Sequence, residues 1–157
     1  MSIMIQHHED VRFSARCGSH HVTIDLPESH GGQDRGMTPP QLFITALGAC
    51  AGVYVADYCD SQAISYQGMR LELDWNYVDR PRRIAGVRVR LELPSGPLTP
   101  DQEQGVRDSV QQCLLHNTLA HKPDFAVEFV STGAGSEAHR VGAAARCDSG
   151  ACCRAEA

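Results

Sequence analysis

The sequence lacks the marks of several large protein classes. Its formal charge is −5 and its cations are scattered, apart from the cluster at residues 80–83, so no surface for nucleic acid or a membrane is indicated. The first residues, MSIMIQHHED, have neither the basic start nor the apolar core of a signal peptide. Phosphate-binding loops, dinucleotide fingerprints and a Ser-His-Asp order are also missing. We therefore expect a cytoplasmic protein with no nucleic-acid or membrane partner and no bound cofactor.

The sequence also lacks an apolar run long enough for a membrane span. Its longest run, Leu42 to Ala56, is shorter than the ~20 residues that a span needs. Thr38 and Gln41 form a capping box around Pro39, which suits the first helical position. Because the helix is apolar on every face, we expect a central helix that is buried on all sides, with Cys50 near its middle.

Alternating apolar and polar residues predict antiparallel strands on both sides of this helix. Residues 11–26 predict a hairpin with Cys17 near its tip, followed by a loop over 27–36 that is rich in turn residues. Residues 69–77 and 87–93 predict two long strands that pair with each other.

A second helix is predicted from Thr99, and its apolar stripe is Val106, Val110, Cys113, Leu114 and Asn117, which places Cys113 on the buried face. Pro123 ends it, and Phe125, Val127 and Phe129 predict a last strand. The sum is an α+β domain over residues 1–130, with two helices on an antiparallel sheet. Residues 131–157 are rich in Gly, Ala, Ser and Arg, and we expect a disordered tail that contains Cys147, Cys152 and Cys153.

Seven cysteines in a cytoplasmic chain are expected to be reduced, catalytic or metal-binding rather than structural disulfides. Cys50 and Cys113 lie about 18–21 Å from the N-termini of their predicted helices. A helix dipole fades within a turn, so an arginine would have to activate either thiol. Small residues around Cys50 (Gly48, Ala49, Ala51 and Gly52) would let the two helices cross closely enough for a disulfide. A buried cysteine is also commonly a small apolar residue, as we expect for Cys59.

The stretch GGQDRGMTPPQLFITALGACAGVYVADYC resembles the signature region of the OsmC/Ohr family of osmotically inducible and organic hydroperoxide resistance proteins. The glycine loop, the Pro-x-Gln-Leu-Phe helix start and the Ala-Cys in mid-helix carry the resemblance, together with the second cysteine in QQCLLHNTL. The resemblance spans about residues 11–130. It implies an OsmC-like intertwined homodimer, with a buried central helix from each chain and active sites at the interface.

The resemblance also implies thiol peroxidase chemistry in oxidative stress defence. Cys50 would attack a hydroperoxide, organic ones in preference to hydrogen peroxide, and become a sulfenic acid. Cys113 would condense with it to form a disulfide, which a dithiol or lipoyl-type reductant would reduce. Leu42, Phe43, Val53 and Tyr54 could surround an apolar peroxide tail or simply belong to the core.

One part of the family's pattern is missing. In that family an arginine stabilises the thiolate and a glutamate near the helix start holds the arginine, but the glutamate position here is Pro40, beside neutral Gln41. We assign the arginine role to Arg35, ahead of Arg16. A carboxylate from elsewhere, such as Glu28 or Asp34, could restore the ion pair.

Other functions stay open. Because the glutamate is missing, the chain could be a non-catalytic member that binds a small apolar ligand in the same pocket. The tail cysteines could form a thiol or metal sensor. Two weaker metal hypotheses are Cys113 with His116, which is half of a zinc motif, and the set His20, His21, His30 and Asp25.

Overall fold

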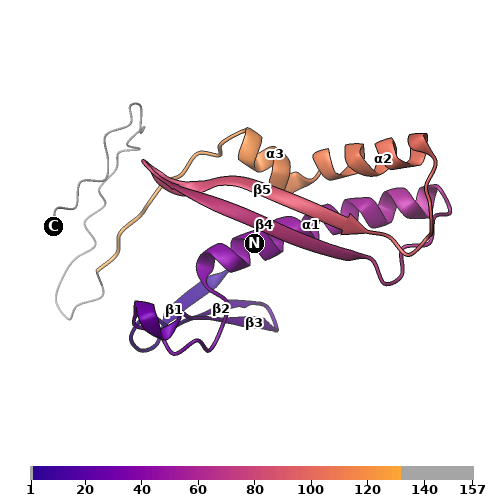
Figure 1. Cartoon of the computed structure of the whole chain (residues 1–157). Helices are drawn as coiled ribbons and strands as arrows, with labels where there is room; N and C mark the ends of the chain where they lie inside the picture. The colour runs from indigo at the N-terminus through magenta and orange to yellow at the C-terminus, as the bar shows by residue number, and fades with distance from the viewer. Residues whose placement is uncertain (1, 132–157) are drawn as a thin grey trace. The chain divides into compact units, whose positions relative to one another are not determined.

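The computed structural model describes residues 2–131 and divides the chain after His121 into two units. All helices and strands of the described residues belong to the first unit (Figure 1). The predicted tail from residue 132 onward, with Cys147, Cys152 and Cys153, lies outside the described residues.

The N-terminal part of the first unit is a three-stranded antiparallel sheet in the order β1-β2-β3. The predicted hairpin is confirmed as β2 (Phe13–Cys17) and β3 (His20–Ile24), with Cys17 opposite His20. Strand β1 (Met4–His7) was not predicted, because all four of its residues are exposed and give no alternation of burial. A short 3-10 helix, η1 (Glu28–His30), lies in the loop that follows β3.

The two long strands are also confirmed, as β4 (Arg70–Asp79) and β5 (Arg82–Glu92), paired antiparallel. They form a separate two-stranded sheet, so residues 2–131 contain two small sheets where a single sheet was expected. The apolar residues of β4 face the central helix, since Leu71 and Leu73 lie against its glycines. This contact fixes one side of the central helix.

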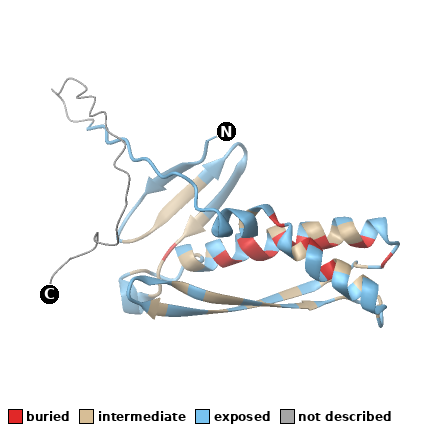
Figure 2. Ribbon diagram, turned by 90° about the horizontal axis from the view of Figure 1, so that it is seen from above, coloured by how far each residue is buried: buried red, intermediate tan, exposed pale blue. Residues whose placement is uncertain are grey.

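The central helix α1 (Pro39–Ser61) begins with the predicted capping box between Thr38 and Gln41. Its buried residues are Ile44, Leu47, Gly48, Ala51, Gly52, Val55 and Cys59. Phe43 and Val53 are 43% and 59% exposed, so the expectation of burial on every side is wrong, because nothing within residues 2–131 covers these two side chains. Figure 2 shows exposed and buried positions alternating along α1. The helix is long and apolar enough to cross a membrane by composition, a test that the core helix of a soluble fold also passes.

The predicted second helix is two helices, α2 (Pro100–Gln111) and α3 (Leu114–Ala120). The backbone of Cys113, with φ −54° and ψ 129°, leaves the helical region and makes this residue the N-cap of α3. The expectation of one continuous Cys-bearing helix is therefore wrong. Cys113 is still completely buried, as its place in the apolar stripe predicted, whereas Leu114 of the same stripe is 65% exposed because it follows the break.

The best-buried part of the core joins α1, α2 and the chain after α1. Val55, Cys59, Ile64 and Val106 form this cluster, and Tyr58 packs against it. The prediction that Cys59 is a core residue is confirmed, and burial raises the pKa of its thiol. Tyr58 also contacts Gly105 so closely that a side chain there would overlap its ring.

The described part of the second unit, residues 122–131, contains no strand. Phe125, Val127 and Phe129 are all strongly exposed. The predicted last strand is therefore wrong for the single chain. Alternation marks a segment that suits a strand, but a strand also needs a neighbour for its backbone hydrogen bonds, and none pairs with it among the described residues.

Candidate active site

The fold brings Cys50 and Cys113 together although they are far apart in the sequence. Cys50 lies in the middle of α1 and is partly exposed, whereas Cys113 lies in the break between α2 and α3 and has 0% exposure. Both α2 and α3 contact α1. The two thiols are free, and they are close enough for each to shift the pKa of the other.

The environment separates the acidities of the two thiols. The donor thiol of Cys113 is the largest cause that lowers the pKa of Cys50, and the backbone N–H groups of Leu115 and Leu114 act in the same direction against desolvation. Burial raises the pKa of Cys113, and so does its hydrogen bond to Cys50. Cys50 is therefore the thiol that ionises more easily, and Cys113 keeps its proton.

The break at Cys113 supplies the donors that the sequence did not reveal. Leu114 and Leu115 are the first residues of α3, and such N–H groups have no partner inside their helix. The Cys113 side chain does not cap them. Our expectation that no helix start could act on Cys50 is wrong, because it counted distance only along two continuous helices.

The arginines proposed from the sequence do not reach Cys50 within one chain. The side chain of Arg35 is exposed and takes part in no ion pair among the described residues, and its charge is not a cause of the Cys50 pKa shift. Arg16 is exposed on β2, opposite His21. The side chain of Gln41 accepts the N–H of Thr38 at 2.8 Å, so the capping box occupies it.

The two carboxylates considered as substitutes for the missing glutamate are exposed. Glu28 lies in η1 and Asp34 in the following loop, and neither forms an ion pair in residues 2–131. Asp34 adopts a positive φ of 54°. A restored Arg–carboxylate pair beside Cys50 is therefore not formed in the single chain.

Asp25 has a role that the sequence reading missed. It is 1% exposed, and its carboxylate accepts the backbone N–H groups of Leu26, Gln33 and Arg35 at 2.8, 3.1 and 3.0 Å. The N–H of Arg35 is the largest cause that lowers the pKa of Asp25, and the nearby charge of Arg12 adds to it. Asp25 thus holds the loop before α1 in place. The sequence signal for this role is an acidic residue that follows a strand and precedes a glycine-rich loop, a pattern that also fits a metal ligand.

The small residues of α1 serve a different contact from the one predicted. A Cβ atom on Gly48 would lie 2.7 Å from Cδ1 of Leu73, and one on Gly52 would lie 3.4 Å from Cδ1 of Leu71. These glycines therefore let α1 approach β4, and they do not serve a crossing with the second helix. Cys50 lies two residues after Gly48, about 200° around the helix, which places it on the side away from β4.

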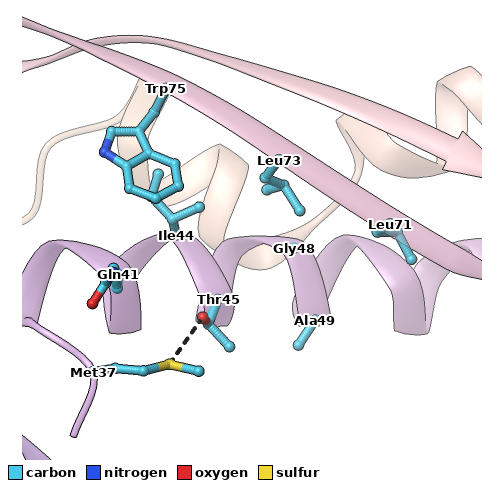
Figure 3. A pocket seen from close by; sticks show the side chains of 9 residues that line it. All are labelled: Met37, Gln41, Ile44, Thr45, Gly48, Ala49, Leu71, Leu73 and Trp75. Atoms are coloured by element: carbon cyan, nitrogen blue, oxygen red, sulfur yellow. Dashed lines mark hydrogen bonds between the residues drawn. The ribbon is translucent and has the colours of Figure 1, made fainter.

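An apolar groove of about 480 Å³ opens on the β4 side of α1 (Figure 3). Thr45 donates a hydrogen bond of 3.6 Å to the sulfur of Met37 at its edge. Its lining residues are Met37, Gln41, Ile44, Thr45, Gly48, Ala49, Leu71, Leu73 and Trp75. Cys50 is not among them, so the groove and the thiol pair occupy different sides of α1.

A second apolar surface adjoins Cys50 itself. Phe43, Val53 and Tyr54 precede or follow Cys50 by seven, three and four residues, so they share its face of α1. Phe43 and Val53 are exposed and Tyr54 is half-buried. Cys50, which is itself partly exposed, therefore shares its face of α1 with apolar side chains.

No group of three or more His, Cys, Asp or Glu side chains could hold a metal ion in the part of the chain that the structure describes. Cys113 is buried and His116 is exposed one turn along α3. Asp25 uses its carboxylate for backbone donors, as described above. Neither metal hypothesis gains support from this arrangement.

The chain is similar to known proteins in both its sequence family and its fold. The model of the family described as OsmC-like protein matches residues 31–128, more than half of the chain. A search of curated proteins found no match.

Solved structures show the same fold at low identity. A protein from Psychrobacter arcticus 273-4, named for osmotic stress induction and a detoxification response, is 18% identical with a TM-score of 0.70, over 75% of this chain and 87% of that one. The OsmC-like protein of Mycoplasma pneumoniae is 17% identical with a TM-score of 0.68, over 77% and 87%. The organic hydroperoxide resistance protein OsmC of Legionella pneumophila is 17% identical with a TM-score of 0.60, over 76% and 88%.

Proposed function

Because the chain belongs to the OsmC-like family, we propose that it is a thiol-dependent peroxidase that reduces hydroperoxides through Cys50 and Cys113. The observation that carries this proposal is the meeting of the two thiols with opposite pKa shifts, lowered for Cys50 and raised for Cys113. A peroxidatic cysteine reacts with the peroxide as a thiolate, and the resolving cysteine gives up its proton when it attacks the sulfenic acid. The names of the solved relatives that refer to organic hydroperoxide resistance agree with this role.

The proposed reaction uses the two sulfurs in turn. The Cys50 thiolate attacks the distal oxygen of R–O–O–H, the O–O bond breaks, and Cys50 becomes a sulfenic acid while the alkoxide takes up a proton to leave as alcohol. The Cys113 thiol then attacks the Cys50 sulfur, which forms the disulfide and releases water. Two electrons pass from the two thiols to the peroxide. A dithiol or lipoyl-type reductant returns them.

The apolar face around Cys50 supports organic hydroperoxides as the substrate class. Phe43 and Val53 are exposed beside the sulfur and would contact an apolar R group. Hydrogen peroxide has no such group and would gain nothing from them. Organic substrates should therefore be preferred through tighter binding.

We also propose a cytoplasmic homodimer. The apolar side chains of α1 that are exposed and the apolar groove against β4 leave apolar surface uncovered in the single chain, and a second copy would cover part of it. A second copy would also be the source of an arginine near Cys50, from Arg35 or Arg16 of the partner subunit. Within one chain the α3 donors already lower the pKa of Cys50.

The decisive experiment measures thiol loss under limiting tert-butyl hydroperoxide for the wild type, Cys50→Ser and Cys113→Ser. The tail cysteines Cys147, Cys152 and Cys153 are replaced by serine in all three. Rapid peroxide consumption by the wild type, none by Cys50→Ser and arrest at the sulfenic acid in Cys113→Ser would support the proposal. A wild-type rate no higher than that of glutathione would rule it out.

The groove against β4 favours a second candidate function, non-catalytic binding of a small apolar ligand. The groove has the size of a small-molecule site and lies away from the thiols. Pro40, where the family has its glutamate, agrees with this alternative. Binding of an apolar fluorescent probe that is abolished by Ala49→Trp, and that Cys50→Ser leaves unchanged, would support it.

A further inference from the structure

A Cys50–Cys113 disulfide would present two very unequal sulfurs to a reductant. Cys113 has 0% exposure, because it lies between the end of α2 and the first turn of α3. Cys50 is partly exposed on the middle of α1. A thiolate attacks a disulfide in line with the S–S bond, so it must reach the attacked sulfur from the side opposite the leaving sulfur.

Resting on the proposed function, we infer that the reductant attacks the sulfur of Cys50 and that Cys113 is the leaving group. The reductant thiolate forms a new S–S bond to Cys50, the Cys50–Cys113 bond breaks, and its electron pair leaves on the Cys113 sulfur, which then takes up a proton. A dithiol reductant completes the cycle with its second thiolate. That thiolate attacks the reductant's own sulfur in the mixed disulfide and releases the Cys50 thiolate.

Leaving-group chemistry alone favours the opposite choice. The thiol with the lower pKa leaves faster, and that thiol is Cys50, which would direct the attack to Cys113. Access to the buried sulfur opposes this preference, since a sulfur with no exposed surface cannot be reached without opening α3. The backbone N–H groups of His116 and Leu115 also donate toward the Cys113 sulfur, so the departing charge is partly stabilised.

This order of attack also favours a dithiol over a monothiol as the reductant. When a monothiol attacks, the released Cys113 lies next to the mixed disulfide on Cys50 and can expel the monothiol again. A dithiol avoids this reversal, because its second thiol resolves the mixed disulfide within the same molecule.

The experiment identifies the attacked sulfur by mass. The disulfide is formed with tert-butyl hydroperoxide and, in a parallel sample, with diamide; excess 2-mercaptoethanol is added, and samples are quenched in acid after short times. The free thiols are then alkylated and the peptides are analysed. Serine replaces the cysteines that would complicate the peptide map: Cys17, Cys147, Cys152 and Cys153.

At the earliest times we expect the 2-mercaptoethanol adduct on Cys50 to exceed that on Cys113 by at least about tenfold. In denaturing urea the excess should fall to within about threefold of equality, because both sulfurs are then exposed. The fully buried Cys59 is the internal control, since its modification before quenching would show that the fold had opened.

An early adduct mainly on Cys113, or the same ratio in native and denatured protein, would overturn the inference. Failure of the peroxide to form the disulfide would count against the proposed function, and the diamide sample would still show which sulfur is attacked. If diamide also fails to join Cys50 and Cys113, the inference is wrong.

Discussion

Replacing Leu114 with proline tests whether the first turn of α3 activates Cys50. Leu114 is the first residue of α3, and its N–H is one of the donors that lower the pKa of Cys50. Proline has no N–H, and it suits the first helical position. The preceding residue, Cys113, has ψ 129°, which is the extended conformation that a following proline favours. The substitution thus removes one hydrogen-bond donor and leaves the helix intact.

The size of the effect follows from the donors that remain. A hydrogen bond to a charged acceptor contributes about 1.5–3 kcal/mol. The variant keeps the donors from Cys113 and Leu115, which lower the pKa of Cys50 more than the Leu114 N–H does. We therefore expect the low end of this range. The pKa of Cys50 should rise toward its ordinary value of 9.0, and the rate of its reaction with peroxide at pH 7 should fall about tenfold.

The assay is alkylation of Cys50 by iodoacetamide across pH, followed by peptide mass, together with the rate of peroxide consumption. Leu114→Ala is the matched control: it also removes the side chain, which is 65% exposed, but keeps the N–H. Circular dichroism and the protection of Cys59 check that both variants are folded. If Leu114→Pro and Leu114→Ala give the same pH profile, the helix start does not activate Cys50.

Three further predictions concern the loop, the core and the proposed dimer. The folded pKa of Asp25 is below its ordinary value of 3.8, so its contribution to stability is present above about pH 4 and is lost as pH falls through the folded pKa. In urea titrations at several pH values, the difference in unfolding free energy between wild type and Asp25→Asn should be largest near neutral pH and should shrink in acid. A difference that stays constant with pH would contradict this. Gly36→Ala should lower the unfolding free energy by about 1–3 kcal/mol, measured by urea unfolding, because the new Cβ would overlap the backbone carbonyl of Thr23. An unchanged urea midpoint would contradict the close approach of residues 36 and 23. Phe43→Glu should shift the proposed homodimer to monomer in analytical ultracentrifugation. Val55→Ala is the control: it should leave assembly unchanged and lower the unfolding free energy by about 2 kcal/mol, because it creates a buried cavity. A Phe43→Glu protein that is still dimeric would place the interface elsewhere.

The parts of the fold that the sequence predicted well are those with strong local signals. The capping box at Thr38 and Gln41 located the start of α1, and the regular alternation over residues 69–77 and 87–93 located β4 and β5. These signals depend only on neighbours in the sequence. The predicted strand through Phe125, Val127 and Phe129 had the same alternation, but its formation depends on a partner strand, which a local pattern cannot supply.

Burial of α1 was predicted less well for a related reason. Apolar residues all around a helix indicate that every face avoids water, but they do not indicate whether the same chain or a second copy covers each face. Phe43 and Val53 are exposed in the single chain. The excess of apolar residues over what the chain itself buries is the quantity that supports the proposed dimer.

The candidate site depended on one backbone feature that periodicity could not reveal. The apolar stripe through Val106, Val110 and Cys113 keeps helical spacing up to the break, so the pattern gives no sign that α2 ends at Gln111. The backbone of Cys113 then leaves the helical region, so this residue is the N-cap of α3 and not a mid-helix residue. The first N–H groups of α3 lower the pKa of Cys50 as a result. The sequence reading required an arginine and found no glutamate at Pro40 to hold it. Because α3 supplies donors that need neither residue, loss of that glutamate does not by itself remove the stabilisation of the Cys50 thiolate.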